Sequence, residues 1–107
     1  MTDRELLELA ANAAALPGIW IEGFGYRVDC EEPYFWNPLT DDAHALRLSV
    51  KLKMSMVLDS SGFKGPTTWV RATGLRTEKT QYHEGDPYAA TRRAIVRSAA
   101  EIGRAME

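Results

Sequence analysis

The stretch GDPYAATRRAIVRSAAEIGRAM, residues 85–106, carries the clearest local structural signal in the chain. Asp86 is a residue type that caps helix N-termini well, and Pro87 suits the first helical position because its missing N–H is no loss there. Apolar or small residues then recur at three- and four-residue spacings through Ile95 and Ile102, with arginines on the opposite side. We therefore predict an amphipathic helix over residues 87–106 that provides the main cover of a sheet.

Two further helices are predicted by the same kind of signal. Thr2 and Glu5 have the spacing of a capping box, which starts a first helix that ends before Gly18. Thr40, followed by two acids, predicts the start of a second helix that runs to about Leu52. This second helix has two neighbouring apolar stripes, so we expect a wide face of it to be covered by other elements. The stripes are Ala43, Leu46 and Val50, and Ala45, Leu48 and Leu52.

The remaining segments show the two-residue period of strands. Residues 19–30 predict one strand with bulky side chains on one face and a bulge or bend at Gly23 and Gly25. The aromatic run at 34–36 predicts an antiparallel return after a turn at 31–33. Residues 54–58 and 67–73 predict a third and a fourth strand, with a turn at 59–62. Residues 75–84 fit either an edge strand or a long loop.

The element order αββαββα indicates the fold class. Because strands and helices do not alternate one by one, we predict an α+β fold with a largely antiparallel four-stranded sheet and helices on its faces. The layers are then those of an α/β/α sandwich. With 107 residues the chain fits one domain, residues 1–107, because two separate cores would each be too small.

Composition and charge restrict the function classes. The net charge is −2, Cys30 is the single cysteine, and the apolar runs are too short to cross a bilayer. The N-terminus is acidic where a signal peptide would be basic. We therefore expect a cytoplasmic protein without a disulfide and without a membrane partner, while the sequence leaves the oligomeric state open.

The sequence shows no set of residues typical of catalysis. The two histidines, His44 and His83, fall on a predicted helix and in a polar segment, and no nucleophile motif accompanies them. His83, Glu84 and Asp86 could present an imidazole and two carboxylates to a metal. Structural zinc sites, however, need four ligands and catalytic ones usually three that converge, and Asp86 already has a role as a helix cap. We expect no metal, no cofactor and no enzymatic activity, and a small hydrolase or other enzyme ranks last among the hypotheses.

Two groups of residues are candidates for binding. The aromatic residues Trp20, Tyr34 and Trp36 would be anchors for a protein partner if exposed, although packing in the core is the alternative interpretation. Arg92, Arg93 and Arg97 would serve a nucleic acid or nucleotide, although the acidic overall balance weighs against this. Binding of a protein is therefore the first hypothesis for function, and nucleic-acid binding is the second.

Four features of the chain occur together: the capped N-terminal helix, an aromatic strand ending in WNPLTDD at residues 36–42, ALRL at residues 45–48, and GDP at residues 85–87 followed by ATRRAI at residues 90–95. Together they resemble a family of small bacteriophage proteins, the phage ABA sandwich domain family. The resemblance covers nearly the whole chain, and residues 63–84 are the least similar part. It implies a layered helix/sheet/helix fold and a phage or prophage accessory protein in the host cytoplasm, and hence a host or phage protein as partner. It implies no activity and no catalytic residues.

Overall fold

Three helices and six strands make up the part of the chain that the structure describes. The computed structural model describes residues 1–59, 65–71 and 79–107. The helices are α1 (Asp3–Ala13), α2 (Asp42–Lys51) and α3 (Pro87–Ala105). The strands are β1 (Gly18–Ile21), β2 (Gly25–Val28), β3 (Tyr34–Trp36), β4 (Ser55–Asp59), β5 (Thr67–Arg71) and β6 (Lys79–Tyr82). The α+β class is therefore confirmed.

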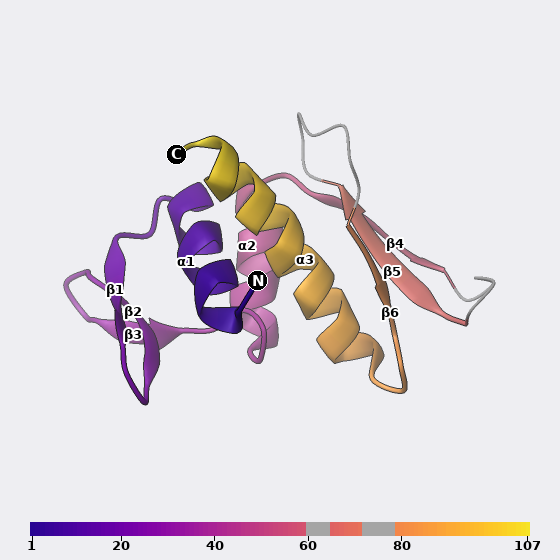
Figure 1. Cartoon of the computed structure of the whole chain (residues 1–107), viewed down its shortest axis with the longest axis horizontal. Helices are drawn as coiled ribbons and strands as arrows, with labels where there is room; N and C mark the ends of the chain where they lie inside the picture. Colours follow the sequence, from indigo (N-terminus) through magenta and orange to yellow (C-terminus); the bar gives the residue numbers. More distant parts are fainter. Residues whose placement is uncertain (60–64, 72–78) are drawn as a thin grey trace.

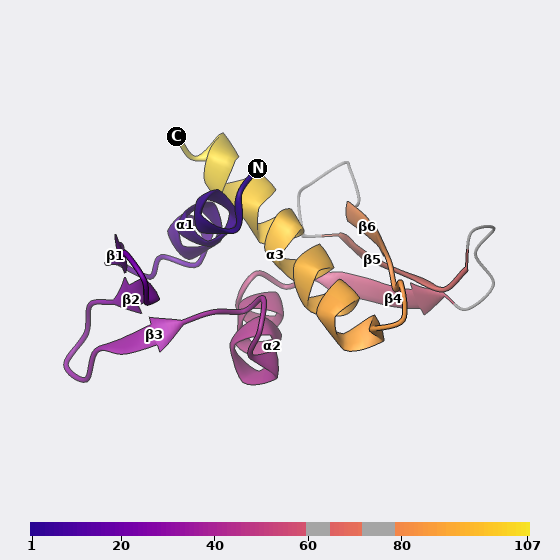
Figure 2. The same ribbon diagram turned by 60° about the horizontal axis from the view of Figure 1, so that its bottom comes forward.

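The strands form two separate sheets, so the prediction of a single four-stranded sheet is wrong. The orders are β1-β2-β3 and β4-β5-β6, and all neighbours are antiparallel. The three helices lie between the two sheets, with β1-β2-β3 on one side and β4-β5-β6 on the other (Figure 1). A second view shows the same arrangement (Figure 2). The layer order is thus sheet, helices, sheet, which inverts the α/β/α order that we expected.

The first sheet gains a strand because residues 19–30 are interrupted by a turn. Gly23 and Gly25 have φ angles of +83° and +115°, a region that residues with a side chain rarely adopt. The backbone therefore reverses between β1 and β2, and Phe24 N–H donates to the Ile21 carbonyl at 3.0 Å. The two glycines mark a hairpin turn and not a bulge in one long strand. The predicted antiparallel return of residues 34–36 is confirmed, because β3 pairs with β2.

The predicted N-caps of α1 and α3 are confirmed, and the cap of α2 lies one residue later than predicted. Glu5 N–H donates to Thr2 Oγ1 at 3.1 Å, and Ala89 N–H donates to Asp86 Oδ1 at 3.0 Å, as predicted. The cap of α2 is Asp41 and not Thr40, since Asp41 Oδ1 accepts from His44 N–H at 3.0 Å. Each cap satisfies an N–H group that would otherwise have no partner in the helix.

The polar segment that the sequence left open forms a strand where it is described. β6 covers Lys79–Tyr82 and pairs with β5, whereas residues 75–78 lie outside the described residues. Most of the predicted turn at 59–62 and the last two residues of the predicted strand at 67–73 also lie outside them. The edge-strand alternative is therefore correct over residues 79–82.

Small residues bring α1 and α3 into close contact at the centre of the molecule. Ala10 and Ala11 of α1, and Ala99 and Ala100 of α3, are at most 2% exposed. A Cβ atom at Gly103 would lie 1.9 Å from the Leu9 carbonyl oxygen, so the backbones touch there. Because α3 packs on α1 and on β5 and β6, it buries a broad part of its circumference.

One of the two apolar stripes predicted to be buried on α2 is exposed. Ala45 and Leu48 are 2% and 3% exposed, as predicted for one apolar stripe, but Leu46 and Val50 of the other stripe are 61% and 69% exposed. Only one side of α2 contacts the rest of the protein, because the helix lies at the margin of the helical layer (Figure 2). The prediction of a wide covered face on α2 is therefore wrong.

Candidate binding surface

The predicted aromatic anchors lie mainly on the inner face of the β1-β2-β3 sheet. Trp20, Tyr26 and Trp36 are opposite one another across the three strands. Trp36 is 4% exposed, and its ring meets that of Tyr26 edge-on with centroids 6.0 Å apart. Trp20 packs partly buried against the same core, with the Arg4 guanidinium 5.7 Å from its ring centroid. Trp20 and Trp36 thus hold the sheet against α1.

Tyr34 is the one residue of the predicted aromatic trio that is exposed, at 41%. Its ring lies 5.8 Å from that of His44, between centroids, so β3 contacts α2 at this point. The side chain of Tyr34 therefore borders both solvent and the first turns of α2.

The outer face of this sheet carries a row of side chains that no other element covers. Ile19, Arg27 and Phe35 lie opposite one another on β1, β2 and β3. Ile19 is 51% and Phe35 47% exposed. Phe24, from the β1–β2 turn, is 74% exposed and stacks on Phe35 with centroids 5.9 Å apart and an interplanar angle of 23°. We call Ile19, Phe24, Arg27 and Phe35 the outer-face cluster.

Sequence reasoning did not select Phe24, and it included Phe35 only as part of the aromatic run at residues 34–36, although the sequence holds a signal for both. Strand alternation places Phe35 on the face opposite to Trp36, so one of the two had to point away from the core. Phe24 stands between two glycines, which is typical of a tight turn, and apolar side chains on turns lie at the surface.

Arg27 sits at the centre of the outer-face cluster with incomplete hydrogen bonding. Its Nε is buried and has no hydrogen-bond partner among the described residues. Its Nη2 lies 3.6 Å from Asp29 Oδ1, a long contact, and its side chain is 42% exposed. The buried Nε is out of reach of a bound molecule, but the exposed end of the guanidinium can donate charge-assisted hydrogen bonds to a carbonyl or carboxylate.

The three arginines proposed for nucleic acid are engaged within the protein. Arg92 donates to the Leu39 carbonyl at 2.8 Å and to Asp42 at 2.7 Å, which ties α3 to the start of α2. Arg93 pairs with Asp3 of α1 at 3.1 Å. Arg97 donates to the Thr80 carbonyl at 3.0 Å and to Gln81 at 3.1 Å on β6. Each of the three thus joins α3 to a different element, although Arg93 and Arg97 also line one hollow together with Lys79 and Glu101.

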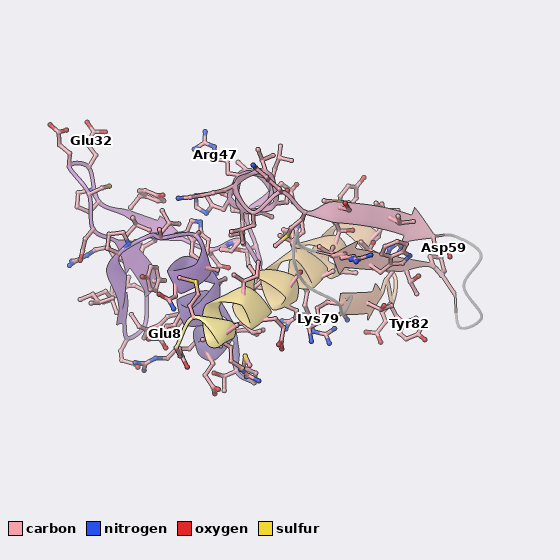
Figure 3. All side chains as sticks on the ribbon, turned by 90° about the horizontal axis from the view of Figure 1, so that it is seen from above. Glu8, Glu32, Arg47, Asp59, Lys79 and Tyr82 are labelled. Carbon is pink, nitrogen blue, oxygen red and sulfur yellow. The ribbon has the colours of Figure 1, made fainter. Side chains whose placement is uncertain are left out.

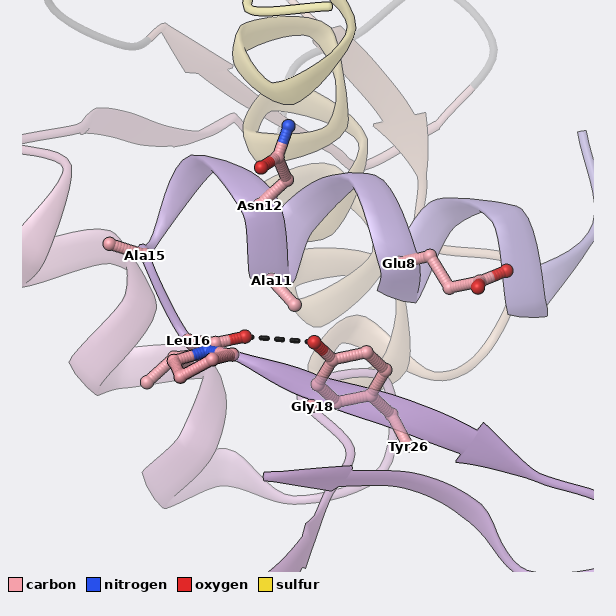
Figure 4. Close-up of a pocket in the computed structure, with 8 residues that line it drawn as sticks. Glu8, Ala11, Asn12, Ala15, Leu16, Gly18 and Tyr26 are labelled. Carbon is pink, nitrogen blue, oxygen red and sulfur yellow. Dashed lines mark hydrogen bonds between the residues drawn. The ribbon is translucent and has the colours of Figure 1, made fainter. Parts of the chain in front are cut away.

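A hollow of 550 Å³ opens between α1 and the first two strands (Figure 4). Its polar side chains already have partners. Tyr26 Oη donates to the Leu16 carbonyl at 2.8 Å, Asn12 Nδ2 donates to the Gly103 carbonyl at 3.3 Å, and Glu8 pairs with Arg4 at 3.1 Å. Burial, with smaller effects of Asp29 and Glu8, raises the pKa of the Tyr26 hydroxyl above its usual value. The hollow therefore offers no polar group held ready for chemistry.

The histidines also serve the fold. His83 Nε2 lies 2.7 Å from Thr68 Oγ1, which is 2.9 Å from Thr91 Oγ1, so this chain of contacts joins β5, the end of β6 and α3. Thr68 is fully buried, so its hydroxyl cannot meet a substrate. Cys30 Sγ donates to the Glu32 carbonyl at 3.2 Å. Residues 1–59, 65–71 and 79–107 contain no group of three or more His, Cys, Asp or Glu placed to hold a metal ion.

Comparison with known proteins gives no relative: no family model, no curated protein and no solved structure matches the chain. Within its described part, no helix is both long and apolar enough to span a membrane.

Proposed function

We propose that this protein acts by stoichiometric, non-catalytic binding of another protein through the outer-face cluster. The observation that carries the proposal is the uncovered row Ile19–Arg27–Phe35 with Phe24 stacked on it. Aromatic residues and arginine are the side chains that contribute most to protein interfaces. A patch in which they surround one incompletely bonded guanidinium is suited to a partner that presents apolar groups and one hydrogen-bond acceptor.

The apolar side chains of the cluster can contribute a substantial part of a binding energy. Burying an exposed Phe or Ile side chain contributes about 1.5–3 kcal/mol, and all three apolar residues of the cluster are about half exposed or more. A few such residues normally dominate the affinity of an interface, while its remaining contacts exclude water. The cluster thus resembles the energetic centre of an interface rather than a whole one.

The identity of the partner rests on the resemblance alone. We take a phage or prophage accessory protein in the host cytoplasm, with a host protein as partner, from the sequence resemblance to the phage ABA sandwich family. No family model matches the chain, and its layers are not in the order that the resemblance implies. Nucleic-acid binding through Arg92, Arg93 and Arg97 is the alternative hypothesis. The contacts of those three residues with α1, α2 and β6 weigh against it, since phosphate would have to displace them.

Site-specific photo-cross-linking tests the proposal. A photoreactive phenylalanine analogue replaces Phe24 in one sample and Tyr88 in a second, because Phe24 and Tyr88 are 74% and 71% exposed and Tyr88 lies on α3, away from the outer-face cluster. Both proteins are irradiated in host-cell lysate at low and high salt, with and without nuclease. We expect a discrete protein adduct at position 24 that is absent at position 88 and withstands nuclease and salt.

Three outcomes contradict the proposal. Equal adducts at both positions would show non-specific contact. An adduct lost on nuclease treatment would favour the nucleic-acid hypothesis. An adduct with twice the mass of the chain would assign the outer-face cluster to self-association.

A further inference from the structure

A small recess lies between β3, the end of α1 and α2, on the opposite side of β3 from Phe35. Its volume is 130 Å³. Its apolar lining is Ala14, Leu16, Trp36 and Leu48. Three of these are at most 4% exposed, so the floor belongs to the rigid core and not to mobile surface side chains. Because the walls come from three elements, the recess forms only in the complete fold.

The rim of the recess is cationic. His44, Arg47 and Lys51 of α2 all line it, at the spacings of three and four residues that place side chains on one face of a helix. Neither Arg47 nor Lys51 makes an ion pair within 4.0 Å among the residues that the structure describes. Figure 3 shows Arg47 projecting from α2 into open space. The Asp41 carboxylate at the start of α2 feels the charge of Arg47 at longer range. Two cationic side chains without a close ion-pair partner thus border an apolar floor.

His44 adds an N–H donor to this rim. The Asn37 backbone N–H donates to His44 Nδ1 at 3.0 Å. A backbone N–H only donates, so Nδ1 accepts, and the neutral imidazole carries its proton on Nε2. That Nε2–H makes no hydrogen bond to any described residue. The rim thus supplies one fixed N–H donor and two cations.

We infer that the recess binds a small carboxylic acid whose apolar part is a single aromatic ring or a short branched chain. An apolar cavity of about 150 Å³ accommodates benzene, so a recess of 130 Å³ takes a group of about that size. Carboxylate is the complementary head group, because it accepts several charge-assisted hydrogen bonds at once. The ring lies against Trp36 and Leu48, and the carboxylate meets His44, Arg47 and Lys51. This site is separate from the outer-face cluster and does not depend on the proposed protein binding.

Calorimetric titration of the full chain with phenylpropionate tests this inference, with phenylpropanol as the matched neutral ligand. We expect phenylpropionate to bind and phenylpropanol to bind at least about tenfold more weakly, because charge-assisted hydrogen bonds are lost. The double variant Arg47→Gln/Lys51→Gln should bind phenylpropionate more weakly by a similar factor. Arg104→Gln, which removes an exposed arginine from α3, and Phe24→Ser, in the outer-face cluster, should bind like the original protein.

Several results would overturn the inference. They are the absence of measurable binding of phenylpropionate, equal affinity for the acid and the alcohol, and unchanged affinity in the double variant despite an unchanged circular-dichroism spectrum. An acetylated Gly-Gly-Phe peptide with a free carboxylate distinguishes a second source of the same head group. If this peptide binds more tightly than phenylpropionate, the recess is a site for a polypeptide C-terminus and not for a small molecule.

Discussion

Replacing Gly103 by alanine should destabilise the protein, although alanine is the better helix former. Gly103 lies within α3, where alanine normally gains about 0.5–1 kcal/mol over glycine. Here the added Cβ would lie 1.9 Å from the Leu9 carbonyl oxygen and 2.7 Å from its carbonyl carbon. Both are backbone atoms, so no side-chain rotation relieves the clash. The two helices must separate, which also strains the hydrogen bond from Asn12 Nδ2 to the Gly103 carbonyl.

The expected size of the effect follows from these opposing terms. Overpacking a tight contact costs about 1–3 kcal/mol, and the helix propensity returns up to about 1 kcal/mol. Because the clash is with backbone atoms at 1.9 Å, the cost lies in the upper part of that range, about 2–3 kcal/mol. We therefore expect a net loss of roughly 1–2.5 kcal/mol in the free energy of unfolding, and a Tm lower by about 4–20 °C. Urea denaturation followed by circular dichroism measures it. Arg104→Ala, in the same turn but exposed, should change stability by less than about 0.5 kcal/mol. If Gly103→Ala is as stable as the original chain or more so, the close backbone contact of α1 and α3 is refuted.

Two further predictions concern the elements that frame the recess and the first sheet. Tyr26→Phe removes the hydrogen bond to the Leu16 carbonyl and should cost about 0.5–1.5 kcal/mol in urea denaturation. Burial raises the pKa of Tyr26, so the stability that its neutral hydroxyl contributes is present below the usual tyrosine pKa and is lost as the pH rises through the raised value. Tyrosinate absorbance of Tyr26 at the same pH as that of free tyrosine, or at a lower pH, would contradict this. The His44 backbone N–H lowers the pKa of Asp41, so the stability from this cap is present above the usual aspartate pKa and is lost as the pH falls through the lowered value. Melting temperatures across the acid range should therefore fall less steeply for Asp41→Asn, and an identical slope would refute the capping role.

The helices could be predicted from sequence because their signals are local. The capping box of Thr2 and Glu5 and the Asp86–Pro87 start need only residues within one turn. The number of strands in the first sheet could not be predicted, because it depended on whether Gly23 and Gly25 bend one strand or reverse the chain. The number of sheets depended on which strands pair over long range. The layer order depends on which faces meet across the whole chain, and no local pattern encodes that choice.

At the candidate site, too, local features could be predicted from the sequence and long-range contacts could not. Alternation along residues 34–36 predicts that Phe35 and Trp36 point to opposite faces, but not which face meets α1. Trp36 turned inward, so Phe35 became the exposed anchor. The partners of Arg92, Arg93 and Arg97 lie up to 90 residues away along the chain, so their structural use was invisible in the sequence. The exposed stripe of Leu46 and Val50 follows from the marginal position of α2, which is equally non-local.

The central claim, that the outer-face cluster is the binding surface, is tested most directly by the affinity of the purified cross-linked partner for three forms of the protein. These are the original chain, the double variant Phe24→Ser/Phe35→Ser, and Tyr88→Ser as the matched control. Complete burial of a Phe contributes about 1.5–3 kcal/mol, and Phe24 and Phe35 are 74% and 47% exposed, so their loss predicts that the double variant binds about twentyfold more weakly or worse. Tyr88→Ser should retain the original affinity. Unchanged binding by a correctly folded double variant, or an equal loss in Tyr88→Ser, would contradict the account.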